Sequence, residues 1–540
     1  MNVIDSDLLS VQEARILLEK AREAREELAL TGQRRLDQVY LHLIKRIKPH
    51  VDELVELAYK ETDYGNPQDE RRLLIHLLEE LPKRLEAMTC VGVIEHDKQT
   101  GISEVGIPKG IVVSLPSAWL STLVTIHNVV LSIKTGNPII VVPHRRAVKT
   151  ACRLMQIITE ALSEVYYPEG AVLVLANYSF EGECELVSSP DVALVIETCR
   201  EHSCSWKETR GKSRFKGTIG NNPVFIEKTA DLKHAAEQIV AGKSFMHGLL
   251  PGVEQSVVVE ASVEDAFKAE LRKAGSYFLS DEEASKLQKV LYDAQGLPRR
   301  EVMGKSALDL SVRAHIDVPA DTKILVVNRP FVSQYSPYSK EKFAPVLSLY
   351  VEEDWRHACE KCIELILNER HGHSLSIYSK DEEVIRQFIL KKPVARVLCN
   401  TSSAFGSIGL NTGLFLSYTL SVAGVGGEAS ANLQPKHFLL CRKSASANSN
   451  ATDQLQSAED AFSLSLKSSD DKKTDNFLIP SKQDLSEISY ATPCQGCIPV
   501  EMLSDYAQDR KEQKKSNSGD WFSNFMSDLK SESNSKGKRP

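Results

Sequence analysis

Short runs of apolar, largely β-branched residues alternate with stretches of helical periodicity through the middle of the chain, and this alternation constrains the fold most strongly. The first four runs lie at 111–114, 138–142, 171–175 and 192–196. Helical patterns at 121–134 and 146–165 separate the first three runs. Strands that are apolar along their whole length are covered on both faces, as in a parallel sheet whose crossovers are helices. The pattern predicts an α/β protein with a Rossmann-like parallel sheet.

The alternation resumes after Gly220 and predicts a second α/β domain. Further strands are expected at 257–259, 324–328, 346–351, 374–378 and 396–399. An amphipathic helix is expected near 354–367, and the apolar spacing over residues 11–64 indicates a helical N-terminal region.

Composition excludes some classes of protein. Of 540 residues, 42% are apolar, and 66 basic against 73 acidic residues give a net charge of -7. These values are typical of a globular protein and argue against a dedicated nucleic-acid or anionic-membrane binder. The most apolar stretch, 110–133, is interrupted by Pro116, His127 and Asn128, so we expect a strand and a buried helix there and no transmembrane segment.

The cysteines indicate which cellular compartment the protein occupies. Eleven are scattered along the chain, and the start MNVIDSDLLS lacks a basic-then-apolar leader. We therefore expect reduced thiols and a cytoplasmic protein.

After about Arg442, serine, lysine, aspartate and asparagine dominate, which predicts a disordered tail. Within it, one helix face would be formed by Trp521, Phe522, Phe525, Met526 and Leu529. This segment is either a docking helix that folds on a partner or incidental residual hydrophobicity.

Several strings occur in a familiar order, among them EVGIPKGIVV, SIKTGNPIIVVPHRRA, EQSVVVE, KEKFAPVLSLY and VGGEASANLQPKHFLL. Together they resemble the CoA-acylating aldehyde dehydrogenases, the family that includes the ethanolamine- and propanediol-utilisation enzymes and the N-terminal half of bifunctional aldehyde-alcohol dehydrogenases. The resemblance covers residues 11–442.

The resemblance implies an aldehyde dehydrogenase fold with a cofactor domain, a catalytic domain and a small oligomerisation arm. The expected divisions are 1–222 for the N-terminal helices and Rossmann-like domain, 223–415 for the catalytic-type α/β domain, 416–442 for the return and oligomerisation segment, and 443–540 for the tail.

In such enzymes a cysteine thiolate attacks the aldehyde, hydride passes to NAD, and CoA takes the acyl group. The register places the nucleophile three residues before Glu254, at Pro251. Proline cannot form a thioester and lacks the backbone N–H that contributes to an oxyanion hole. Because the neighbouring cysteines along the chain are Cys204 and Cys359, we interpret Pro251 as part of a Pro-Gly turn.

Two further family positions are also substituted. Leu120 stands where the family has an asparagine that binds the aldehyde oxygen, and leucine donates no hydrogen bond. Thr198 is followed by Cys199, Arg200 and Glu201, where the family has a Thr-Gly-Gly turn that lets the backbone approach the cofactor. Poor NAD binding is therefore expected.

Other candidates keep two interpretations. Glu341 matches the family glutamate that holds the nicotinamide ribose, or it is a hinge carboxylate retained with the fold. His373 matches a family histidine near the catalytic domain, and a structural role is the default. The pairs Cys359/Cys362 and Cys494/Cys497 have CxxC spacing. Core packing is expected for the first, with a metal or redox role as the alternative, and a local disulfide or metal clip is the functional alternative for the second. No metal site is predicted.

These substitutions favour a non-catalytic homologue that serves as a structural or interaction subunit. The resemblance suggests an enzyme assembly or a bacterial microcompartment as its setting. We expect a homo-oligomer or a mixed oligomer with an active paralogue, and docking of 518–530 on a shell or scaffold protein. The alternative is an active NAD-dependent CoA-acylating aldehyde dehydrogenase of the acetaldehyde or propionaldehyde class.

Overall fold

The computed structural model describes residues 5–199, 212–218, 220–369, 372–422, 431–446 and 454–462. The chain divides into two units, Met1–Asn448 and Ser449–Pro540. In the second unit residues 454–462 form a helix, so this part of the predicted tail has regular structure. The candidate docking segment 518–530 and the Cys494/Cys497 pair lie outside the described residues.

Four helices begin the first unit: α1 Ser6–Leu28, α2 Gln33–Ile47, α3 Val51–Thr62 and α4 Pro67–Glu86. The Asp5 carboxylate caps α1 by accepting hydrogen bonds from the backbone N–H groups of Asp7 and Leu8. Asn66 caps α4, and Pro67 occupies its first position, where no intrahelical N–H is needed. The predicted helical N-terminal region is confirmed, and α4 extends it.

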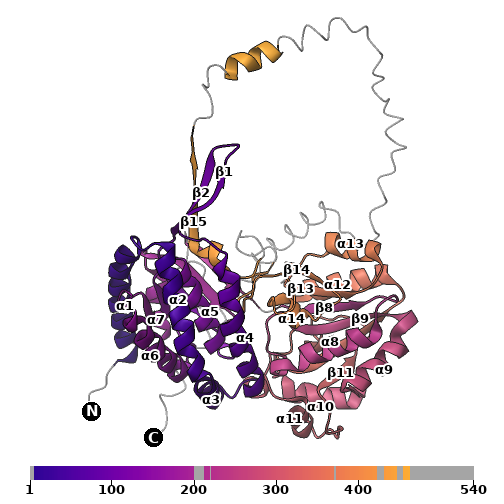
Figure 1. Cartoon of the computed structure of the whole chain (residues 1–540). Coiled ribbons are helices and arrows are strands. Elements are labelled where there is room, and N and C mark those ends of the chain that lie inside the picture. Colours follow the sequence, from indigo (N-terminus) through magenta and orange to yellow (C-terminus); the bar gives the residue numbers. More distant parts are fainter. Residues whose placement is uncertain are drawn as a thin grey trace, which may run out of the picture. The chain divides into compact units, whose positions relative to one another are not determined.

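The first large sheet is parallel and has the order β5-β4-β3-β6-β7 (Figure 1). Its strands are β3 Ile111–Leu115, β4 Ile139–Val141, β5 Val172–Val174, β6 Val192–Thr198 and β7 Ser213–Gly217. The crossovers carry α5 Ser121–Lys134, α6 Val148–Glu164 and α7 Phe180–Ser188. This order confirms the Rossmann-like prediction and places a topological switch between β3 and β6, where open α/β sheets bind ligands beyond the carboxyl ends of their strands.

The second large sheet is also parallel and has the order β10-β11-β12-β9-β8-β13-β14. Its strands are β8 Asn222–Ile226, β9 Glu254–Glu260, β10 Ser276–Leu279, β11 Ile324–Asn328, β12 Val346–Glu352, β13 Ser374–Tyr378 and β14 Arg396–Cys399. Its helices are α8 Leu232–Ser244, α9 Glu264–Ala274, α10 Asp281–Leu291, α11 Ala307–Arg313, α12 Trp355–Glu369, α13 Glu382–Lys391 and α14 Ser403–Ser407. The prediction of a second α/β sheet is confirmed.

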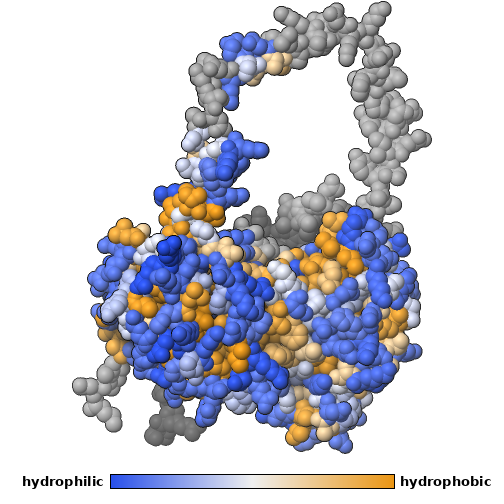
Figure 2. Space-filling model, viewed as in Figure 1, coloured by the Kyte–Doolittle hydropathy of each residue, from blue (hydrophilic) through white to orange (hydrophobic). Residues whose placement is uncertain are grey.

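A small antiparallel sheet forms an arm (Figure 1). Its strands are β1 Gly92–Asp97, β2 Ile102–Pro108 and β15 Leu439–Ala445, with β2 in the centre. The predicted oligomerisation segment 416–442 supplies the start of β15, which continues to Ala445. Val93, Ile94 and Leu440 are exposed on this sheet, and Figure 2 shows hydrophobic surface at its base.

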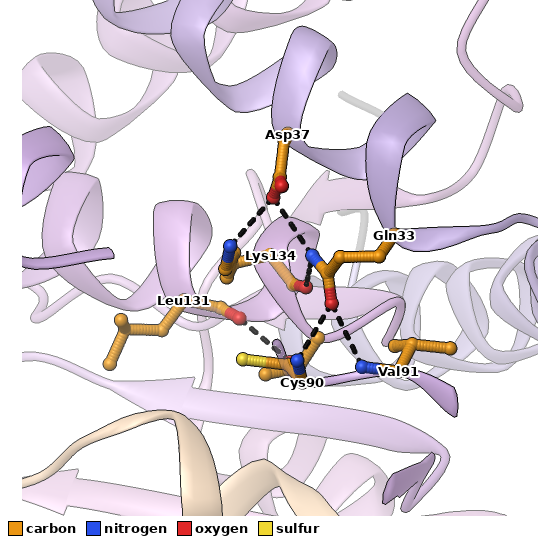
Figure 3. A network of polar contacts seen from close by, with 7 residues as sticks. Gln33, Asp37, Cys90, Val91, Leu131 and Lys134 are labelled. Carbon is orange, nitrogen blue, oxygen red and sulfur yellow. Dashed lines mark hydrogen bonds and ion pairs between the residues drawn. The ribbon is translucent and has the colours of Figure 1, made fainter. Parts of the chain in front are cut away.

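A buried polar network joins α2 to α5 beside the start of the arm (Figure 3). The fully buried Lys134 donates to Asp37 over 2.7 Å, and the Gln33 amide donates to the same carboxylate over 2.8 Å. The Gln33 oxygen accepts from the backbone N–H groups of Cys90 and Val91, each at 2.8 Å. A buried ammonium needs such a partner, because an unpaired charge is costly to remove from water.

Two further expectations, about the apolar stretch and about the cysteines, can be compared with the structure. The apolar stretch at 110–133 is a buried strand followed by a buried helix, as predicted, and none of the described helices is long and apolar enough to span a membrane. The expectation of reduced thiols is wrong at one position, since Cys184 on α7 is disulfide-bonded. A cysteine count cannot detect this pairing, which depends on tertiary proximity.

Candidate functional site

The candidate site lies where the carboxyl end of the first large sheet meets the amino end of the second. Segment 116–120 follows β3, and Thr198 ends β6. The segments that lead into β9 and β12 carry Pro251 and Glu341. The rings of Trp119 and Phe343 join the two sides, with their centroids 5.7 Å apart.

Pro251 forms the predicted turn between the 3-10 helix Phe245–Gly248 and β9, and it is buried. The following residue, Gly252, has φ +76°, and a Cβ added there would lie 2.6 Å from Ser407 Oγ and 3.2 Å from His373 Cε1. The turn therefore passes directly against Ser407 and His373. Pro251 presents no heteroatom to them.

His373 directly precedes β13, and its imidazole is buried. Its Nδ1 lies 2.9 Å from Ser374 Oγ, and Ser407 Oγ donates to that same hydroxyl over 2.9 Å. Its Nε2 is buried and has no hydrogen-bond partner. Burial, reinforced by Arg396, holds the pKa of His373 well below its usual range. The site thus contains a neutral imidazole beside the turn.

Leu120 lies at the point where the chain enters α5, and its side chain is completely buried. It belongs to one hydrophobic cluster with Trp119, Leu250, Val253 and Phe343. These residues come from both sides of the site, so apolar side chains fill the region beyond β3. No amide donor stands at Leu120.

Thr198 makes its contact within the protein. Its hydroxyl lies 2.6 Å from that of Thr419. The next residue, Cys199, has φ +43°, and its N–H donates to Gly217 O. Burial, with the nearby Glu341 and Glu197 carboxyls, raises the pKa of Cys199 above its usual range. Arg200, Glu201 and Cys204 lie outside the described residues.

Glu341 is buried, and its carboxyl accepts a hydrogen bond from Gly220 N at 2.8 Å. Its own N–H donates to Glu369 over 3.1 Å. Burial, with Glu369 close by, raises the pKa of Glu341 well above its usual range. Both interpretations of Glu341, as a ribose-binding glutamate and as a hinge carboxylate, stay predictions.

A buried ionic network surrounds the start of β9. Lys243 donates to Gln255 Oε1 over 3.0 Å, and burial lowers the pKa of Lys243 to about 7. Lys342 donates to Gln255 O over 2.9 Å. Glu254 accepts from the Ser402 hydroxyl over 2.7 Å, and burial raises its pKa. These groups are engaged with one another at the amino edge of the sheet.

The structure thus brings the four site residues named from the sequence, Pro251, Leu120, Glu341 and Thr198, to one region. The contacts across that region are made by their neighbours, such as Trp119 and Phe343. Sequence reasoning did not identify Thr419, Ser407 or Lys243. Thr419 is 221 positions from Thr198, and no local pattern indicates that pairing. Among the described residues, no group of three or more His, Cys, Asp or Glu side chains could hold a metal ion.

The family model for the aldehyde dehydrogenase family matches residues 3–285. The chain belongs to the aldehyde dehydrogenase family. A probable aldehyde dehydrogenase from Listeria monocytogenes shares 34% identity with it at a TM-score of 0.79, covering 83% of this chain and 100% of that one. An acetylating aldehyde dehydrogenase from Geobacillus thermoglucosidasius shares 26% identity at a TM-score of 0.79, covering 83% and 99%.

Aldehyde-alcohol dehydrogenase 2 from Entamoeba histolytica is 28% identical over 407 residues, which is 74% of this chain and 47% of that protein. The chain therefore spans about half the length of such curated relatives. It is related to the CoA-acylating members of the family.

Structures at 21 to 22% identity share the fold. They include a propionaldehyde dehydrogenase from a bacterial microcompartment of Clostridium phytofermentans, an engineered glycolyl-CoA reductase with bound NADP+, and a propionaldehyde dehydrogenase from Rhodopseudomonas palustris with bound CoA.

Proposed function

We propose that this chain is a non-catalytic member of the aldehyde dehydrogenase family and acts as a structural or interaction subunit. The observation that carries the proposal is Pro251, a buried turn residue at the position that the resemblance assigns to the nucleophile. Cys199, a thiol in the same region, does not replace it, because burial and Glu341 keep that thiol protonated, and the thiolate is the nucleophilic form.

The residues at the expected cofactor-binding region, after β6 and β3, support the same proposal. NAD and CoA are the cofactors that the resemblance implies. The residues described beyond β6 do not fit a dinucleotide well, since Cys199 carries a half-buried side chain where a glycine would let phosphate approach the backbone. The Thr198 hydroxyl is already paired with Thr419, and Trp119 and Leu120 fill the region beyond β3.

An active NAD-dependent CoA-acylating aldehyde dehydrogenase is the second candidate. One observation favours it: the neutral His373 lies against the turn at Gly252, where a base could serve a nucleophile. Relatives named as acetylating or propionaldehyde dehydrogenases suggest acetaldehyde or propionaldehyde as its substrate.

One assay separates the two candidates. The purified full-length chain is mixed with NAD, CoA and acetaldehyde or propionaldehyde, and NADH formation is followed. We expect no turnover, because losing a covalent nucleophile costs on the order of a million-fold in rate. Robust turnover by the unmodified chain would refute the non-catalytic proposal.

Three variants locate the defect. Pro251→Cys restores a thiol, and Pro251→Ala removes the ring without adding one. Combining Pro251→Cys with Leu120→Asn also restores the amide donor. Activity gained only by the cysteine variants would assign the loss to the missing nucleophile, and an NAD titration of each variant tests the cofactor side separately.

The proposed subunit assembles through the arm and the tail. We propose a homo-oligomer or a mixed oligomer with an active paralogue, and docking of 518–530 on a shell or scaffold protein of a bacterial microcompartment. Deleting residues 518–540 should abolish co-purification with that partner and encapsulation. Unchanged co-purification and localisation would contradict the docking proposal.

A further inference from the structure

A lysine and a cysteine from neighbouring helices of the second large sheet are in direct contact. Cys359 lies in α12, and Lys392 follows the last residue of α13. Lys392 Nζ is 2.6 Å from Cys359 Sγ and donates to Cys359 O over 2.7 Å. The two residues are only 6% and 7% exposed and stand 33 positions apart in the chain.

The surroundings hold this pair in place. The Lys392 ammonium lies 4.1 Å from the centroid of the Phe388 ring, and that ring stacks on Phe225 with centroids 4.8 Å apart. No carboxylate among the described residues forms an ion pair with Lys392. Its polar partners are therefore the thiol and the carbonyl of Cys359.

Cys362 is the competing reaction partner, since it follows Cys359 by one helical turn. Its side chain is completely buried, and burial raises the pKa of Cys362 to about 12. A thiol that stays protonated is a poor nucleophile toward a peroxide or another sulfur. Cys359, which retains a small exposed fraction, is the more accessible of the two thiols.

We propose that Cys359 and Lys392 form a reversible, peroxide-driven covalent link that joins α12 to the end of α13. In the first step, the Cys359 sulfur attacks one oxygen of hydrogen peroxide and the O–O bond breaks. The departing hydroxide takes a proton from the Lys392 ammonium, so that a sulfenic acid, one water and a neutral amine form. In the second step, the lone pair of the Lys392 amine attacks that sulfur, the S–O bond breaks, and an S–N bond and a second water form. One peroxide is reduced to two waters while the sulfur loses two electrons.

The link closes a covalent loop across β13, the strand that lies between α12 and α13 in sequence. A cross-link of this span restricts the unfolded chain, so it should raise the thermal midpoint of unfolding by several degrees. A thiol reductant should reverse the link, as it reverses other sulfenyl derivatives.

The full-length protein is treated with hydrogen peroxide, its free thiols are alkylated in denaturant, and its peptides are mapped without reduction. We expect a cross-linked peptide pair containing Cys359 and Lys392 that has lost two hydrogen atoms and separates with dithiothreitol.

Three variants make the experiment decisive. Cys362→Ser removes the competing thiol and should keep both the cross-link and the thermal shift. Lys392→Arg retains the charge, and Cys359→Ser retains the shape; both should lose the cross-link. In the native chain, a Cys359–Cys362 disulfide overturns the proposal. In Cys362→Ser, which cannot form that disulfide, oxidised Cys359 beside unmodified Lys392, or no reaction at all, overturns it. None of these readouts depends on dehydrogenase activity.

Discussion

Glu70, in the first turn of α4, is a buried carboxyl whose contribution to the stability of the fold falls as the pH rises. Burial raises its pKa to about 8 from the ordinary value of 4.5. The folded state therefore holds a proton that the unfolded state releases above about pH 4.5, so the stability from this group is present below that pH and is lost as the pH rises through 8. This sign is the reverse of that for an ion-paired carboxylate.

Glu70→Gln should remove this pH dependence. The variant should be more stable than the native chain above about pH 8, by on the order of 3 kcal/mol, and the difference should shrink toward about pH 5. Urea unfolding across that range measures the effect. Glu79→Gln, at an exposed position of the same helix, serves as the control. Equal pH profiles for the native chain and Glu70→Gln would contradict the prediction.

Gly252 follows Pro251, the position to which the resemblance assigns the nucleophile, and it allows a test of crowding in this turn. Its φ of +76° disfavours any side chain, and a Cβ would also meet Ser407 Oγ at 2.6 Å. Gly296 has a similar φ of +74°, but nothing lies within 4 Å of its added Cβ. Gly252→Ala should therefore lower the free energy of unfolding by about 2 kcal/mol more than Gly296→Ala. Equal losses would show that the turn is not tightly packed.

At the residue scale, the sequence register identified Pro251 and Leu120 because their motifs are continuous along the chain. The contacts that surround them come from distant segments. Ser407, which meets the turn at Gly252, ends α14, and Thr419, which pairs with Thr198, lies in the return segment 416–442. Their hydroxyls carry no local signal in the sequence.

At the scale of elements, the sequence predicted best where burial is continuous. The helix expected at 121–134 coincides with α5, and the strand expected at 324–328 coincides with β11. Strand β8 begins with Asn222 and Pro223, a turn-like pair, although all of its residues are buried. Strand β1 is exposed along its whole length, so its sequence lacks the alternation of apolar and polar residues that predicts a half-buried strand.

The exposed arm yields a prediction about assembly. Val93 and Leu440 lie on the outer strands of the three-stranded sheet and are 57% and 47% exposed. If the arm mediates oligomerisation, Val93→Asp with Leu440→Asp should convert the oligomer to a monomer, since buried charges are costly at an apolar interface. Light scattering after size exclusion at micromolar concentration measures this. Val312→Asp, at a 73% exposed position of α11, is the matched control. A native chain that is already monomeric would contradict the assembly proposal.

At the scale of the molecule, the resemblance gives the order of the sheets but not the contacts that join them. One hydrophobic cluster contains Leu120 and Trp119 from the first large sheet together with Leu250, Val253 and Phe343 from the second. A cluster shared in this way couples the two halves, so they should unfold together.

Trp119 is the residue whose loss should uncouple the halves. Its ring contacts Tyr64 at 6.3 Å and Phe343 at 5.7 Å between centroids, both edge-on. Trp119→Ala should cost about 3 to 5 kcal/mol by leaving a cavity between the two sheets, and it should split or broaden a single calorimetric transition. Trp355→Ala is the control, because Trp355 packs only on the cluster of the second sheet around α12. That variant should lower the transition temperature without splitting the transition. If Trp119→Ala unfolds in one sharp step with the stability of the native chain, the shared cluster does not couple the two sheets.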